Sequence, residues 1–294
     1  MKNQSVLTWL IPIIGILSLF AAAAGLFWPG EGQPYAYTSL RGEAVMINAR
    51  GLYFYDTVSS AAQMQANDLI TLVLGLPLLV VSTWLALRGS LRGRLLLTGT
   101  LGFFLYTYMS MTFTTAFNVL FLVYVALFSL SLFAFILAMM SFDLASLPAQ
   151  FSERLPRRTI AGLMIATGSF LLLAWVGGRI LPPLMNNTAP GLENTTTMVI
   201  QAMDLGLILP LAFLSAILLL RARPWGYLLA SVAVMKMLTM GVAVSTMGIN
   251  MALQGVPDSM IIVGIFIVLT LINMVLAVLL LKNVKTPPPG MRPA

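Results

Sequence analysis

Long apolar runs separated by short charged stretches constrain the fold of this chain more than any other feature. A helix needs about 20 residues, at roughly 1.5 Å each, to cross a bilayer. The runs that reach this length cover residues 6–28, 67–87, 95–114, 117–140, 159–180, 199–220, 226–249 and 260–281. The chain is 59% hydrophobic and only 9% charged, too little charge to cover a water-facing surface. We therefore predict an all-α integral membrane protein with eight transmembrane helices.

The first run could be mistaken for a secretory signal peptide, because Ala21–Ala24 offers the small residues that suit a cleavage site. However, the apolar stretch continues to Trp28 and exceeds the roughly 7–15 residues of a signal-peptide core. We therefore expect a retained helix.

The distribution of basic residues predicts the orientation. Most Lys and Arg residues fall in the loops on the side of the N-terminus, and only Arg41, Arg50 and Arg179 fall in loops on the other side. Cytoplasmic loops of membrane proteins are enriched in Lys and Arg. We therefore expect a multi-pass protein of the cell inner (plasma) membrane with both termini in the cytoplasm.

The absence of Cys and His excludes disulfides, thiol chemistry and the usual zinc and haem ligands. No Gly-rich phosphate loop follows a predicted strand, so no cofactor or metal is expected. The net charge of +7 is spread over helix ends rather than gathered on a soluble basic domain. The lipid bilayer is therefore the expected partner, and nucleic acid is not.

Two segments of the chain can be aligned with each other: GLPLLVVSTWLALRGSLRGRLLL from Gly75 and ILPLAFLSAILLLRARPWGYLLA from Ile208. The alignment matches Pro77 with Pro210, Ser82 with Ser215, Arg88 with Arg221, and Gly93 with Gly226. Leucine-rich helices align by composition alone, but Pro, Ser, Arg and Gly in one register favour a duplication. It predicts two parallel four-helix repeats, 1–150 and 151–294, with Pro77 and Pro210 as helix kinks or, alternatively, moving hinges.

The longest loop, residues 29–66, is expected outside the cytoplasm. VMI and LYFY flank Asn48–Gly51 and suggest a β-hairpin, and the following SSAAQMQAN suits the start of a helix. Tyr35, Tyr37, Tyr53 and Tyr55 suit the lipid headgroup layer, so the loop is either an interfacial cap or a lid over a pocket. The tail TPPPGMRPA is expected to be short and disordered.

The segments GLYFYDTVSSAAQMQANDLITLVLGLPLL, RGSLRGRLLLTGTLGFFLYTY and LFLVYVALFSLSLFAFI resemble a family of uncharacterised bacterial polytopic integral membrane proteins. The resemblance covers roughly residues 45–140. It implies a bacterial inner membrane, and it transfers no activity and no functional residue.

Lys236 is the residue that the apolar runs explain least. It lies near the middle of the run 226–249, where a charged Lys costs about 2.5–3.5 kcal/mol. Depths counted along the helices place it in a candidate polar cluster for ligand binding or ion pairing. The members of this cluster are Lys236, Asp204, Asn273, Asp68, Tyr106 and Tyr108.

Three interpretations of Lys236 compete. It is a structural ion pair or neutral lysine, a binding group for an anionic substrate or coupling proton, or a Schiff-base lysine for a chromophore. The third is disfavoured because Val232 stands where a counter-ion aspartate is expected. Asp68 and Asp204 also lie near helix N-termini, where a carboxylate can act as a cap.

The sequence thus favours a transporter or permease with a site between the two repeats, around Lys236 and Asp204, for a small anionic or amphiphilic ligand. The alternative is a non-catalytic structural or accessory subunit bound to a membrane protein partner. An enzyme is less favoured, because only carboxylates and Lys would be available for catalysis.

Overall fold

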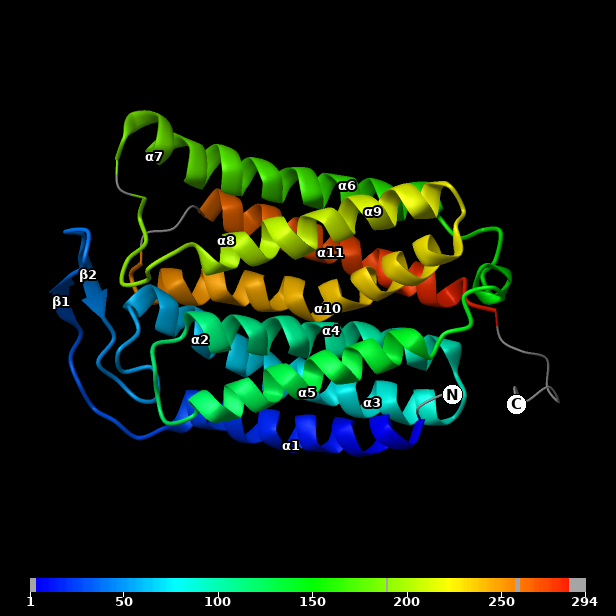
Figure 1. The fold of residues 1–294 in the computed structure, drawn as a ribbon, viewed down its shortest axis with the longest axis horizontal. Helices are drawn as coiled ribbons and strands as arrows, with labels where there is room; N and C mark the ends of the chain where they lie inside the picture. The colour runs from blue at the N-terminus through cyan, green and yellow to red at the C-terminus, as the bar shows by residue number, and fades with distance from the viewer. Residues whose placement is uncertain (1–3, 189, 257–259, 286–294) are drawn as a thin grey trace.

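A computed structural model describes residues 4–188, 190–256 and 260–285, and the predicted disordered tail lies outside these residues. The chain is mostly helical, and the helices run along the long axis of the molecule (Figure 1). In the described part, seven helices are long and apolar enough to cross a membrane, and a two-stranded antiparallel sheet lies at one end. The prediction of a multi-pass helical membrane protein with a small hairpin is confirmed at this level.

The first 140 residues form one helix, the sheet, a long helix in three parts, and two further helices. Their bounds are α1 (Gln4–Phe27), β1 (Tyr35–Thr38), β2 (Ala44–Ile47), α2 (Val58–Ile70), the π-helical η1 (Thr71–Gly75), α3 (Leu76–Leu87), α4 (Leu91–Thr114) and α5 (Phe121–Met140).

The rest of the chain forms a short linker helix, two helices that contain π-helical segments, and two long uninterrupted helices. Their bounds are the 3₁₀ helix η2 (Leu147–Gln150), α6 (Arg157–Leu172), the π-helical η3 (Leu173–Ile180), α7 (Leu181–Asn186), α8 (Val199–Met203), the π-helical η4 (Asp204–Ile208), α9 (Leu209–Leu220), α10 (Pro224–Leu253) and α11 (Met260–Lys282).

Helix α4 corresponds to the predicted run 95–114 but is not among the seven candidate spans. It packs against α3, α5 and α10, and most of its side chains are buried. Several of its threonine hydroxyls bond within the helix, as Thr98 does to the carbonyl of Arg94 and Thr100 to that of Leu96. A helix enclosed by other helices contacts little lipid, so it needs less apolar surface than its neighbours.

The two ends of the bundle differ in charge and in structure. The sheet and the segment 29–57 lie at one end, here called the hairpin end, and the start of α1 and the end of α11 lie at the other, the terminal end (Figure 1). Basic residues cluster at the helix ends of the terminal end: Arg88, Arg92, Arg94, Arg154, Arg157, Arg158, Arg221, Arg223, Lys282 and Lys285.

One of the two predicted hairpin strands is present: VMI lies in β2, but its partner is β1 rather than the predicted LYFY. Tyr35–Thr38 pairs with Ala44–Ile47, whereas the expected second strand, residues 52–55, is a turn. The Asn48 side chain donates hydrogen bonds to the carbonyls of Arg50 and Tyr53, and Ala49 and Gly51 have φ of 55° and 56°. This folds the chain back within a few residues, so Tyr53 turns into the bundle instead of pairing along a strand.

The polar stretch SSAAQMQAN extends the second span toward the hairpin end, as its composition suggested. The helix begins at Val58 rather than near residue 67, and the Thr57 hydroxyl caps it by accepting from the backbone N–H of Ser60. The lipid-facing exterior carries exposed large apolar side chains on helices from both ends of the chain, among them Trp9, Ile16, Val80, Leu122 and Ile261. This surface matches a bilayer environment.

The segments that align in sequence also share backbone features at the same spacing. Pro77 and Pro210 are each the second residue of a helix that directly follows a π-helical segment. Gly89 and Ala222 both have positive φ, 79° and 53°. Added Cβ atoms at Gly93 and Gly226 would collide with the backbone of the preceding helix, α3 and α9 respectively.

Candidate functional site

Lys236 lies in the middle of α10 and points toward α4. Its Nζ is 4.2 Å from the centroid of the Tyr106 ring, a cation–π contact. The side chain is partly buried, and among the described residues no acceptor forms a hydrogen bond or ion pair with the ammonium. The direct polar contact of the ammonium is therefore the aromatic face of Tyr106.

Asp204 is the first residue of the π-helical segment η4, and its side chain is buried. Both carboxylate oxygens accept hydrogen bonds. The Tyr106 hydroxyl donates to Oδ1 at 2.6 Å, and the Trp175 indole N–H donates to Oδ2 at 2.9 Å. Both oxygens of Asp204 are therefore held by donors from α4 and η3.

Tyr106 therefore connects the two charged residues. Its ring face contacts Lys236, and its hydroxyl contacts Asp204, so the two opposite charges do not touch. The four side chains come from α4, η3, η4 and α10, and α4 precedes the 141–156 linker while the other three follow it. Residues far apart in the chain thus form one polar group, here called the central cluster (Tyr106, Trp175, Asp204 and Lys236).

Close helix packing fixes the position of Lys236. A Cβ added at Gly99 of α4 would lie 2.3 Å from the Met235 Cβ and 2.8 Å from the Lys236 backbone nitrogen. One turn later, a Cβ at Gly102 would lie 3.8 Å from the Lys236 Cγ. Glycine at these positions lets α4 and α10 approach closely, so the lysine stem passes directly over α4.

The other candidates of the predicted cluster lie elsewhere. Asn273 is buried on α11 and donates to the backbone carbonyl of Val234 at 3.1 Å, so it joins α11 to α10 without contacting the Lys236 ammonium. Tyr108 packs on Phe104 and Tyr124, with ring centroids 6.3 and 6.5 Å away. Asp68 accepts a hydrogen bond from the Tyr53 hydroxyl at 2.5 Å and forms a separate group.

Asp68 and Asp204 are not N-terminal caps in this structure. Asp68 lies near the C-terminal end of α2, whose cap is Thr57, and Asp204 follows the short helix α8 within a continuous helical segment. Pro77 and Pro210 each follow a π-helical turn, a register change that accommodates a residue without an N–H.

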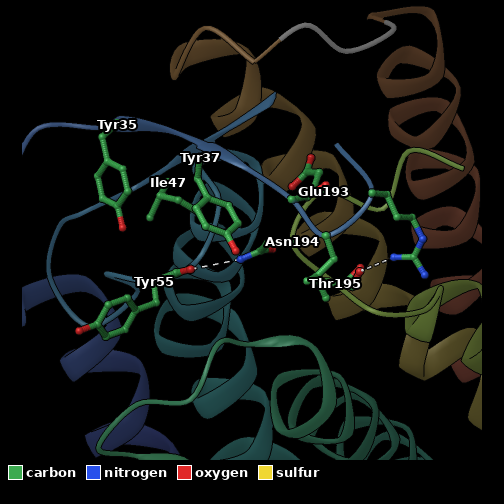
Figure 2. A pocket seen from close by; sticks show the side chains of 10 residues that line it. Tyr35, Tyr37, Ile47, Tyr55, Glu193, Asn194 and Thr195 are labelled. Carbon is green, nitrogen blue, oxygen red and sulfur yellow. Dashed lines mark hydrogen bonds between the residues drawn. The ribbon is translucent and has the colours of Figure 1, made fainter. Parts of the chain in front are cut away.

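A second candidate site is a pocket of about 290 Å³ at the hairpin end (Figure 2). Tyrosine rings and short polar side chains line it, from the hairpin on one side and from residues 193–195 on the other. The lining comprises Tyr35, Tyr37, Ser39, Leu40, Arg41, Ile47, Tyr55, Glu193, Asn194 and Thr195. Its size is at the lower end for small-molecule sites.

Hydrogen bonds across this pocket tie the segment 29–57 to residues 193–196. Arg41 donates to the carbonyls of Thr195 and Thr196, and the Asn194 amide donates to the carbonyl of Tyr55 at 3.2 Å. The Thr57 hydroxyl donates to the Glu193 carboxylate. We call these contacts the cross-loop bridge. They place the segment over the bundle, consistent with either a cap or a lid.

Asp56 lies beneath this bridge and is almost fully buried. Burial raises its pKa to about 6, although the Ala116 N–H and the Ser60 hydroxyl donate to its Oδ1 and oppose the shift. Among the described residues, His, Cys, Asp and Glu form no group of three or more that could hold a metal ion.

Two residues of these sites were missed from the sequence: Trp175, a partner of Asp204, and Tyr53, the partner of Asp68. The sequence assigns Tyr53 to the headgroup layer and gives Trp175 no role. The only available signal was that a buried Trp or Tyr needs a hydrogen-bond partner. The sequence does not show which acceptor such a residue meets.

No protein-family model, curated protein or solved structure matches this chain.

Proposed function

We propose that this chain is a transporter or permease for a small anionic or amphiphilic ligand, with its binding site at the central cluster. The observation that carries the proposal is the Lys236 ammonium, which lies near mid-depth and has no carboxylate in direct contact among the described residues, since Asp204 lies beyond the Tyr106 hydroxyl. An unpaired charge at this depth is costly, and a ligand anion would offset the cost. Ionisable residues inside membranes mark ligand or ion pathways by default.

The proposed architecture is eight transmembrane helices in two parallel four-helix repeats, with α4 as the eighth span. The matched π-helical segments, positive-φ positions and close-packed glycines support the duplication. In this arrangement α4 and α10 are equivalent helices that meet at the centre, and the central cluster lies where the halves join. Parallel-repeat transporters place substrate sites at such interfaces.

The proposed location is a cell inner membrane, with the terminal end in the cytoplasm. The cluster of Arg and Lys at that end supports this orientation. The resemblance of residues 45–140 to uncharacterised bacterial membrane proteins supports a bacterial origin.

The alternative function, a non-catalytic subunit of a membrane complex, is favoured by one feature. Both Asp204 oxygens already have protein donors, and these contacts join α4, η3 and η4. In this view the central cluster holds helices together, and Lys236 adds a cation–π contact.

Thermal stability of the purified chain in detergent distinguishes the two functions. Wild type, Lys236→Met and Asp204→Asn are heated with and without acetate, octanoate or an alkyl phosphate. For a transporter, at least one anion raises the Tm of wild type, and Lys236→Met abolishes that shift while its unliganded Tm stays at or above the wild-type value. The lysine then serves binding rather than folding.

Tyr106→Phe is the matched control, because it keeps the ring under Lys236 and removes only the hydrogen bond to Asp204. We expect it to retain an anion-dependent shift. If Lys236→Met and Asp204→Asn both unfold at lower temperature than wild type, and no anion stabilises wild type, the transporter proposal is rejected in favour of the structural subunit.

A further inference from the structure

Asp68 is a buried carboxyl group that the central cluster does not use. It is 2% exposed, and the Tyr53 hydroxyl, which donates to Oδ2, is its only hydrogen-bond donor among the described residues. Counted along the helix from Val58, it lies about 15 Å from the hairpin end of α2. It is therefore inside the bundle, and one residue of the 29–57 segment covers it.

The groups that face Asp68 from the surrounding elements are all uncharged. They are Ser18 of α1, Tyr53 of the loop, Tyr108 of α4 and Tyr124 of α5. The hydroxyls of Ser18, Tyr108 and Tyr124 are buried and approach one another or Tyr53, but within the described chain none reaches hydrogen-bond geometry.

Helix α1 closes the remaining side of this group, because a Cβ added at Gly25 would lie 1.8 Å from the Asp68 Oδ2. Helix α10, which also packs on α2, carries Lys236 as its only ionisable group away from its ends, and that ammonium contacts Tyr106. Among the described residues, no cation on these elements contacts Asp68, because the Lys236 ammonium lies against Tyr106.

Asp68 and Asp204, the two aspartates buried within the helices, therefore differ in what their surroundings offer. Asp204 has two donors, with a lysine ammonium beyond one of them. Asp68 has one neutral donor and no cation within the described chain. A buried carboxylate without a counter-charge takes up a proton rather than bear the cost of desolvation.

We propose that Asp68 is a proton-binding site of this protein. The carboxyl is neutral while Tyr53 covers it. When the 29–57 segment lifts, the carboxyl O–H bond breaks, the proton passes to water at the hairpin end, and the carboxylate becomes hydrated. Because the cross-loop bridge ties this segment to residues 193–196, lifting it also separates parts of the chain on either side of the linker.

This inference deepens the proposed function by naming the proton as the coupling ion, and in that part it rests on the transporter proposal. The protonation of Asp68 itself can be measured without any ligand or transport assay.

Carbodiimide labelling tests the proposal on the full-length wild-type chain in detergent. N,N′-dicyclohexylcarbodiimide attacks protonated carboxyl groups in apolar surroundings, and peptide mass mapping locates the adduct. At about pH 7.5, where an exposed aspartic acid is fully ionised, we expect the adduct on Asp68 and none on Asp204. An unlabelled Asp68, or a labelled Asp204 beside an unlabelled Asp68, overturns the proposal.

Two variants sharpen the result. Tyr53→Phe keeps the ring over Asp68 and removes its one hydrogen-bond donor, so labelling of Asp68 at about pH 7.5 should persist. Infrared difference spectra of wild type against Asp68→Asn should show the carbonyl stretch of a neutral carboxylic acid, and its absence counts against the proposal. Asp204→Asn is the matched control and should leave that band in place.

The results separate the two proposals. If Asp68 is labelled but no anion stabilises the protein through Lys236, the proton site stands and the transporter proposal fails. If anions bind through Lys236 but Asp68 is ionised, the transporter proposal stands and the proton-site proposal fails.

Discussion

Tyrosine is a hydrogen-bond partner of each of the two aspartates buried within the helices, Asp68 and Asp204. Tyr106 donates to Asp204 and Tyr53 donates to Asp68. A tyrosine can bury a large apolar ring and still supply one neutral donor at its end. This chain thereby holds two carboxyl groups inside a helical bundle without placing a cation in contact with either, and the Lys236 ammonium stays available.

The buried carboxyl group of Asp56 predicts that the folding stability of the chain depends on pH. Its pKa is about 6 in the folded chain, above the ordinary value for aspartic acid, because burial disfavours the charge. The folded chain therefore binds this proton more tightly than the unfolded chain. The stabilisation that this proton gives the folded state is fully present below about pH 4. It is lost as pH rises through about 6, and the total loss is up to roughly 3 kcal/mol.

We expect Asp56→Asn to flatten the loss of stability between about pH 5 and pH 7.5. The measurement is the Tm of both proteins across this range. Asp143→Asn is the control, because that exposed side chain has a pKa lowered chiefly by the Ser146 hydrogen bond and is ionised throughout. An unchanged pH slope in Asp56→Asn would show that Asp56 does not carry this effect.

At the scale of elements, the tight turns that join α3 to α4 and α9 to α10 invite a direct comparison. Each has a left-handed residue just after an arginine that ends the helix: Gly89 after Arg88 and Ala222 after Arg221. Both positions are exposed. Glycine adopts this conformation freely, whereas a Cβ costs about 1 kcal/mol or more.

We predict that Gly89→Ala lowers the stability of the protein and that Ala222→Gly raises it, each by about 1 kcal/mol. Chemical or thermal unfolding in detergent measures both. Gly93→Ala is the control for a strongly destabilising change, because its Cβ would lie 2.4 Å from the Leu85 Cβ and 2.6 Å from the Ala86 nitrogen. Effects of the same sign at 89 and 222 would refute the equivalence of the two turns.

The sequence predicted these elements unevenly. Apolar runs bounded by charges located the spans well, and the run 199–220 matches its helical segment at both ends. The hairpin was misplaced, because local turn preferences around Asn48–Gly51 cannot show that Tyr53 binds Asp68 inside the bundle. The central cluster was anticipated in part: depth along the helices put Asp204 within partial reach of the Lys236 side chain and Tyr106 nearby, but depth alone also included Asn273 and Asp68, which face elsewhere.

At the scale of the whole molecule, hydrogen bonds join distant parts of the chain at both ends of the bundle. The cross-loop bridge lies at the hairpin end. At the terminal end, Arg92 donates to the Val284 carbonyl at 2.7 Å and the Ser152 N–H donates to the Asn283 carbonyl. If the two proposed halves move relative to one another, either the cross-loop bridge or the Arg92–Val284 hydrogen bond must break, which would suit alternating exposure of the proposed central site.

The lack of cysteine makes the orientation simple to test. Leu40→Cys introduces an exposed thiol at the hairpin end and Glu153→Cys one at the terminal end. We expect a membrane-impermeant maleimide to label Leu40→Cys in intact spheroplasts and Glu153→Cys only after permeabilisation. Wild type is the unlabelled control. The reverse pattern would place the Arg-rich end outside.

The enclosure of Asp68 also has a consequence for biosynthesis. Its covering groups come from two separated stretches of the chain: α1 and Tyr53 are synthesised before Asp68, whereas Tyr108 and Tyr124 follow it. While α4 and α5 are still inside the ribosome, the newly inserted α2 must present this carboxyl to lipid or to the insertion machinery, at a cost of about 2.5–3.5 kcal/mol if it is charged. Nascent chains that stop before Phe121 should therefore depend on membrane chaperones far more than chains that extend past Met140.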